Sequence, residues 1–177
     1  GYCCYILLYR MPADGWEAGP DAPLQDAQRA VRTIRSRARV DGFDPGRIGV
    51  IGFSAGGHLA ARLISESRPA YASLDDVDAQ PFTVAGAGLL YPVILTEGPA
   101  AHMRSRTELL GPSPSPERIA SYAGNAKVSA ATPPTFIAHA LDDKGVPADN
   151  SLAMLASLRA AGVKAELHLF ERGGHGF

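Results

Sequence analysis

The hexapeptide Gly-Phe-Ser-Ala-Gly-Gly at positions 52–57 constrains the fold of this chain more than any other segment. A short run rich in Ile and Val precedes it at 47–51, which predicts a buried parallel strand. Strong helix formers follow at 58–64, which predicts a helix. Ser54 is therefore expected on a sharp strand-to-helix turn, where a Cβ on the flanking glycines would clash with neighbouring backbone. The free N–H groups at the helix N-terminus would also favour a developing oxyanion beside that hydroxyl.

The overall composition is that of an ordinary globular protein. The 177 residues suffice for one sizeable core, so we expect a single domain over 1–177. The formal net charge of −1 predicts no recruitment of nucleic acid or of an anionic membrane surface. The longest apolar run, 2–9, is far shorter than the ~20 residues that span a bilayer. Cys3 and Cys4 are adjacent in that run and cannot join distant segments, so we expect buried thiols.

Apolar segments and amphipathic segments alternate along the rest of the chain. Besides the strand before Ser54, strands are predicted at 3–9, within 84–95, at 134–141 and at 166–170. Besides the helix after Ser54, helices are predicted at 24–40, at 104–110 and from about 149 to 161. This alternation predicts an α/β fold, a mostly parallel sheet flanked by helices on both faces. The loop 67–81 carries Asp75, Asp76 and Asp78, which we interpret as solvated surface because no spaced-ligand pattern follows.

Three chemically matched groups follow three different predicted strands. Ser54 follows the strand at 47–51, Asp142 and Asp143 follow the strand at 134–141, and His175 follows the last one. A serine hydroxyl needs a base within hydrogen-bond reach and a third group that orients the base. The carboxyl ends of parallel strands meet at one edge of a sheet, where functional groups gather. The order Ser, Asp, His along the chain is the one that this arrangement uses.

Each of these residues also has a structural interpretation. Ser54 alone could cap a helix, the aspartates could bracket a turn, and His175 could be a surface residue. The convergence on one sheet edge, and the glycines around His175, favour catalysis. The other histidines are weaker candidates: His58 and His139 are expected to pack internally, His168 to point across the sheet, and His102 either to line a pocket or to be structural. No spacing typical of metal ligands is present, so neither a metal nor a cofactor is predicted.

With these residues the chain resembles the α/β-hydrolase superfamily over essentially its whole length. More narrowly, it is similar to bacterial serine esterases of the acetyl-xylan-esterase-like group. The resemblance is carried by segments 9–10, 23–27, 44–60, 91–93, 132–136, 139–147 and 173–177. It implies that Asp143 is the acid rather than Asp142, from the family pattern His-Gly-x-x-Asp-x-x-Val-Pro, in which Ala140 here replaces the glycine. It also implies that the backbone N–H of Ala55 belongs to the oxyanion hole.

The resemblance implies a serine hydrolase that cleaves esters of small acyl groups, with acetylated plant polysaccharide as the candidate substrate. Tyr91 and His102 are the candidate substrate-binding residues. The expected partner is a small-molecule or polysaccharide ester, with no nucleic acid and no membrane span. Two alternatives stay open: a peptidase of the prolyl-oligopeptidase kind, and a non-catalytic binding module on a hydrolase fold. The sequence predicts neither an oligomeric state nor a compartment.

One element of the family pattern has no counterpart here, the glycine-rich loop that completes the oxyanion hole. The chain starts at Gly1 in the lead-in to a predicted strand and stops at Phe177 after a Gly-Gly-His-Gly loop, which indicates a piece of a longer protein. The strand at 3–9 would then lack its family neighbour. We therefore expect these residues on their own to be poorly soluble and to have little esterase activity.

Overall fold

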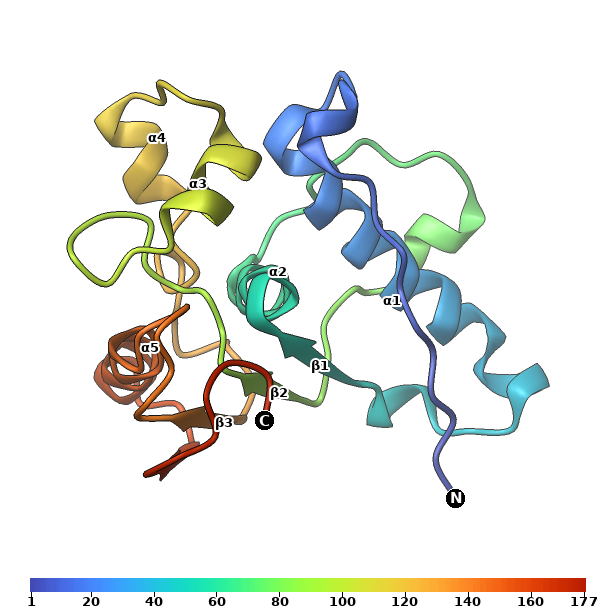
Figure 1. The fold of residues 1–177 in the computed structure, drawn as a ribbon. Coiled ribbons are helices and arrows are strands. Elements are labelled where there is room, and N and C mark those ends of the chain that lie inside the picture. Colours follow the sequence, from blue (N-terminus) through green and yellow to red (C-terminus); the bar gives the residue numbers. More distant parts are fainter.

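A computed structural model describes residues 1–177, and its centre is a four-stranded parallel sheet (Figure 1). The strands are β1 (Gly49–Phe53), β2 (Gly86–Leu90), β3 (Thr135–Ala140) and β4 (Ala165–Phe170). They lie side by side in chain order, and each neighbouring pair is parallel. Four of the five predicted strands are thereby confirmed, since apolar runs of this length are typical of parallel strands. The strand before Ser54, however, is only partly buried.

The helices are α1 (Ala22–Asp41), α2 (Ser54–Ser65), α3 (Met103–Leu110), α4 (Pro116–Ser121) and α5 (Asp149–Ala160). Short 3₁₀ helices cover Pro12–Asp14, Gly19–Asp21, Pro45–Arg47 and Asp76–Ala79 (η1 to η4). Gly42, with a φ of 75°, ends α1 in the left-handed conformation that glycine adopts without strain. None of these helices combines the length and the apolar character that crossing a membrane requires.

The helices that contact the sheet, α2 and α5, pack on the same face of it (Figure 1). Their apolar side chains join those of the central strands in one buried cluster: Ala60, Ala61, Ile64, Ala87, Leu89, Ile94, Ile137, Met154 and Leu158. On the opposite face Ile51, Phe53, Phe136 and Phe170 are exposed. The prediction of helices on both faces is therefore wrong for these residues. Parallel crossovers are right-handed, so strands added in one direction place every crossover helix on one face.

The predicted strand at 3–9 does not form. No backbone-to-backbone hydrogen bond joins residues 1–10 to the rest of the chain, and a strand exists only where its backbone pairs with another. The segment instead runs along α1, held by the Tyr5 hydroxyl on Asp41 and by the Arg10 guanidinium on Asp26, 2.7 Å away. Cys3 and Cys4 are exposed, so the expectation of buried thiols is wrong for the same reason.

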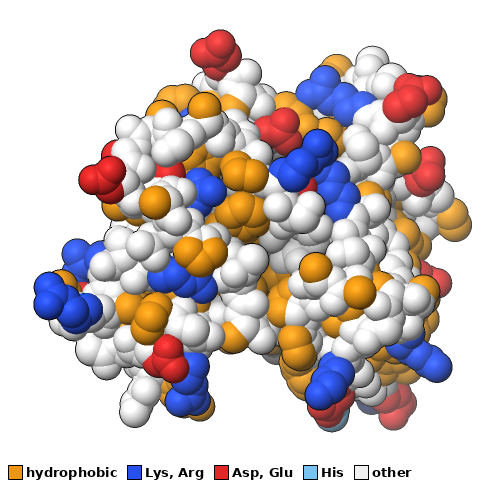
Figure 2. All heavy atoms as spheres, turned by 180° about the vertical axis from the view of Figure 1, so that it is seen from behind, with side chains coloured by type: hydrophobic (Ala, Val, Ile, Leu, Met, Phe, Trp, Pro, Cys, Tyr) orange, Lys and Arg blue, Asp and Glu red, His pale blue; other side chains and the backbone are white.

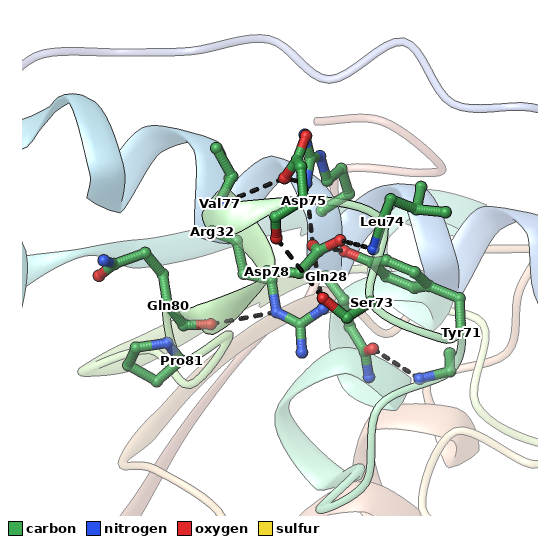
Figure 3. A network of polar contacts seen from close by, with 12 residues as sticks. Gln28, Arg32, Tyr71, Ser73, Leu74, Asp75, Val77, Asp78, Gln80 and Pro81 are labelled. Atoms are coloured by element: carbon green, nitrogen blue, oxygen red, sulfur yellow. Dashed lines mark hydrogen bonds and ion pairs between the residues drawn. The ribbon is translucent and has the colours of Figure 1, made fainter.

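Two of the three carboxylates of the loop 67–81, Asp75 and Asp78, belong to an ion-pair network (Figure 3), whereas Asp76 is exposed, as expected of solvated surface. Arg29 of α1 holds Asp75 with two hydrogen bonds of 2.7 Å. Asp78 has a side chain only 1% exposed and lies 3.0 Å from Arg29 and 3.2 Å from Arg32. The Tyr71 hydroxyl donates to the same carboxylate. The loop is thus fastened to α1 by charges that lie 46 residues apart in the sequence.

The protonation of Asp78 is shifted by these neighbours. Burial alone would raise the pKa of Asp78, but the hydroxyl of Tyr71, the N–H of Leu74 and the guanidinium of Arg29 together hold that pKa well below its usual value. The carboxylate is therefore charged at neutral pH, and its partners satisfy it. Elsewhere on the surface, positive and negative side chains are interspersed, as Figure 2 shows for one face.

Candidate active site

The turn that carries Ser54 is crowded on two sides. Ser54 has a φ of 50°, which is uncommon for a residue with a side chain, and it opens α2 directly after β1. A Cβ on Gly52 would lie 2.3 Å from the carbonyl oxygen of Gly56, and one on Gly57 would lie 2.7 Å from the Pro92 Cβ. A Cβ on Gly56 would meet nothing within 4 Å. The expected steric demand thus falls on Gly52 and Gly57, and not on Gly56.

The structure brings together Ser54, His175 and Asp143. The Ser54 Oγ lies 2.8 Å from the His175 Nε2, and the His175 Nδ1 lies 2.7 Å from the Asp143 Oδ2. The three side chains come from the carboxyl ends of β1, β3 and β4, which the parallel sheet places at one edge. In the loop that presents His175, Gly174 and Gly176 have φ values of 64° and 90°, which side chains rarely adopt.

The two neighbouring aspartates have different partners. Asp143 is buried, and its Oδ1 accepts the N–H groups of Gly145 and Val146 at 2.9 Å each. Burial alone would raise the pKa of Asp143, but these N–H groups and His175 hold that pKa below its usual value. Asp142 is exposed and accepts the N–H of Gly174 at 2.8 Å, beside His175 in the sequence. Asp143 therefore faces the imidazole, while Asp142 holds the loop that carries it.

A second histidine, His139, also lies close to the Asp143 carboxylate. It is fully buried in β3, with its Nδ1 2.7 Å from the Ser151 Oγ and its Nε2 2.8 Å from the carbonyl oxygen of Val146. A carbonyl oxygen only accepts hydrogen bonds, so the proton is on Nε2 and the Ser151 hydroxyl donates to Nδ1. The same Nε2 atom lies 3.3 Å from the Asp143 Oδ2. The expectation that His139 is buried is confirmed, and its contact with Asp143 is a feature that sequence reasoning missed.

The two candidate substrate-binding residues have different surroundings. Tyr91 has a φ of 37°, and its ring centre is 5.1 Å from that of His175. His102 caps α3 through its Nδ1, which lies 2.7 Å from the Ser105 Oγ, and it lines a cavity of about 280 Å³ to which Ala55 also contributes. Ala55 is the second residue of α2, so its N–H has no partner within the helix.

The remaining histidines do not contact Ser54. His58 is buried with its Nε2 2.7 Å from the carbonyl oxygen of Tyr122, and burial lowers the pKa of His58 to about 4, so it is neutral at pH 7. His168 pairs with Glu166 on the exposed face of β4. No cluster of three or more His, Cys, Asp or Glu side chains has the geometry to hold a metal ion.

A parallel sheet with a serine on a strand-to-helix turn, and with Asp and His after later strands, defines an α/β hydrolase. The family model BD-FAE matches residues 1–158 of the chain. The chain therefore belongs to the BD-FAE family.

Two curated proteins are related to it. It is 35% identical over 160 residues to "Endo-1,4-beta-xylanase B" of Butyrivibrio fibrisolvens, and the match covers 87% of this chain and 24% of that protein. It is 32% identical over 182 residues to "Acetylxylan esterase" of Xylanibacter ruminicola, covering 100% of this chain and 35% of that protein. The chain thus spans about a quarter to a third of the length of these relatives.

Solved structures agree on the fold. An acetyl ester-xyloside bifunctional hydrolase from Caldicellulosiruptor lactoaceticus superposes with a TM-score of 0.81 at 41% identity, covering 88% of this chain and 57% of that one. A truncated carbohydrate esterase from gut microbiota superposes with a TM-score of 0.82 at 24% identity, covering 96% of this chain and 66% of that one. The second match, at its low identity, bears on the fold alone.

Proposed function

We propose that this chain carries the catalytic residues of a serine esterase, within an α/β-hydrolase catalytic domain. Ser54 is the nucleophile, His175 the general base and Asp143 the orienting acid. The observation that supports these roles is the unbroken chain of short contacts from the Ser54 Oγ through both ring nitrogens of His175 to the Asp143 carboxylate. The names of the relatives, which include an acetylxylan esterase, support ester hydrolysis.

The geometry is suited to acyl transfer. His175 Nε2 takes the hydroxyl proton as the Ser54 Oγ attacks the acyl carbonyl, and it then protonates the leaving alcohol. Asp143 keeps the other ring nitrogen protonated and stabilises the imidazolium. The N–H of Ala55 faces the helix N-terminus, where it donates to the carbonyl oxygen as negative charge develops there. Water repeats the sequence on the acyl-enzyme and releases the acid.

The substrate class that fits best is an ester of a small acyl group, with acetyl groups on xylan as the leading candidate because two relatives carry xylan in their names. A peptidase would use the same three residues. The preference for an ester over a peptide substrate therefore depends on the similarity to these relatives. A non-catalytic module would have no use for a serine–histidine contact of 2.8 Å. Labelling of Ser54 by a fluorophosphonate probe would distinguish an esterase or peptidase from a non-catalytic module, because only an activated serine reacts with the probe.

Hydrolysis of 4-nitrophenyl acetate by variants of the natural protein tests the roles. Ser54→Ala and His175→Ala should each lower kcat at least about 10³-fold, and the double variant should lose little more, because the residues act as a unit. Asp143→Asn should lower kcat about 10²–10⁴-fold by presenting an N–H to the ring. Asp142→Asn is the matched control and should lose much less, since its amide oxygen can still accept from Gly174. Turnover retained by Ser54→Ala would contradict the assignment.

A further inference from the structure

The cavity of about 280 Å³ beside the nucleophile turn carries a charge that ester hydrolysis itself does not need. It lies between α2, which contributes Ala55 near its start and Arg62 in its last turn, and α3, which contributes Arg104, Arg106 and Glu108. Three arginines and one glutamate therefore line a space that Ala55, the residue after Ser54, also lines. An ester of a neutral alcohol with acetate would gain nothing from these cations.

The arginines differ in how well they are already paired. Arg62 stacks on the ring of Tyr122 at 4.2 Å and lies 3.5 Å from the Asp21 carboxylate, so its charge is largely engaged. No carboxylate lies within ion-pair distance of Arg104 or Arg106. Arg104 and Arg106 thus line the cavity without an ion-pair partner.

Arg106 is the less satisfied of the two. Its Nε is buried and has no hydrogen-bond partner, and its one hydrogen bond is a 3.4 Å contact from Nη1 to the carbonyl oxygen of Thr96. A guanidinium has five N–H donors in a planar fork, and burying an unpaired donor costs free energy. A carboxylate is the acceptor that matches a guanidinium in both charge and geometry, and here it would bind the terminal Nη groups, because the enclosed Nε offers no surface to a ligand.

We infer that this cavity binds a carboxylate carried by the ester substrate, with Arg106 as its main ligand and Arg104 at the rim. The inference rests on the proposed esterase function and adds a substrate class to it, esters that bear an acidic substituent. Glu108 opposes such a ligand and limits the net charge of the cavity. The side on which the carboxylate lies, acyl group or alcohol, is left to the test.

Two matched pairs of substrates separate charge from reactivity. On the alcohol side, 4-acetoxybenzoate is compared with its methyl ester; on the acyl side, 4-nitrophenyl hydrogen succinate is compared with 4-nitrophenyl methyl succinate. The measured quantity is the ratio of kcat/KM for the anionic ester to that for the neutral ester. In at least one pair, Arg106→Gln of the natural protein should lower this ratio about tenfold or more, as expected for a lost charge-assisted hydrogen bond. Glu108→Gln should raise it, and higher salt should shrink both effects.

Arg118→Gln is the matched control, because Arg118 lies on α4 outside the cavity lining and should leave the ratio unchanged. A ratio that Arg106→Gln leaves unchanged in both pairs, while Ser54-dependent hydrolysis persists, would overturn this inference and leave the esterase proposal intact. Hydrolysis of neutral esters that survives Ser54→Ala would instead overturn the proposed function. Binding of 4-acetoxybenzoate to the Ser54→Ala variant, measured by calorimetry, supplies a readout that needs no turnover and should weaken about tenfold with Arg106→Gln.

Discussion

The substitutions Gly57→Ala and Gly56→Ala make the same chemical change at successive positions of α2. We expect them to have opposite effects on the stability of the fold. A Cβ on Gly57 would lie 2.7 Å from the Cβ and 2.9 Å from the Cα of Pro92. Both atoms belong to a fully buried proline ring, which cannot rotate out of the way. A Cβ on Gly56 would meet open space, and Gly56 has no positive φ that would strain it.

The magnitude follows from the overlap. Carbon atoms prefer to be about 3.5–4.0 Å apart, so α2 and the Pro92 loop must separate by roughly 1 Å to admit the methyl group of Gly57→Ala. Overpacking of this kind costs about 1–3 kcal/mol. Replacing glycine by alanine inside a helix returns up to about 1 kcal/mol, equally in both variants. Gly57→Ala should therefore be less stable than Gly56→Ala by about 1–3 kcal/mol, with the helix-propensity effect cancelled in the comparison.

Urea unfolding followed by far-ultraviolet circular dichroism measures this difference, provided that both variants keep the wild-type m value. Gly57→Ala should also lower esterase kcat, because Pro92 follows Tyr91, whose ring packs 5.1 Å from that of His175. Equal free energies of unfolding for the two variants would refute the steric reasoning. They would show that the loop after β2 yields without cost.

Two further predictions concern buried polar groups. The His139→Gln variant keeps an N–H that can donate toward Val146 and Asp143, whereas the His139→Asn variant keeps only the contact with Ser151. The kcat of the Asn variant should therefore be about tenfold lower than that of the Gln variant, at similar KM. Equal losses of kcat in the two variants would count against a positioning role for His139. The pKa of Asp78 is lowered on folding, so its carboxylate stabilises the fold above the unfolded value of about 4, and this contribution is lost as the pH falls below that value. The free energy of unfolding should therefore fall more steeply from pH 5 to pH 2 in the wild type than in Asp78→Asn, and parallel urea-titration curves would contradict this.

Local sequence pattern was sufficient for the elements whose structure depends on near neighbours. The strands β1 to β4 follow apolar runs, and α1 follows a regular apolar stripe that Gly42 ends. Helix α4 has no counterpart among the predicted helices, although Ser115 caps it and Pro116 occupies its first turn. That signal was present in the sequence and could have been used.

Partners distant in the sequence account for the expectations that were wrong. The segment 3–9 has the composition of a strand, but pairing requires a second backbone, and composition does not supply one. Hydrophobic periodicity identifies strands and helices but does not reveal the spatial order of the strands in the sheet. The sheet face on which each helix packs could therefore not be inferred from it. The partners of Asp78 on α1, Arg29 and Arg32, are 46 or more residues away, so the local sequence around Asp78 indicates only solvated surface.

The two aspartates after β3 show how one residue step separates two tasks. The Oδ1 of Asp143 accepts the N–H groups of the residues two and three positions ahead, which closes a local turn and fixes its side chain with Oδ2 toward His175. Asp142, one step earlier, is exposed and accepts the N–H of Gly174. One carboxylate thus orients the ring of His175, and the other holds the backbone just before it. Residue type alone could not assign these two roles, because the side chains are identical. The turn formed by the residues that follow them assigns the roles.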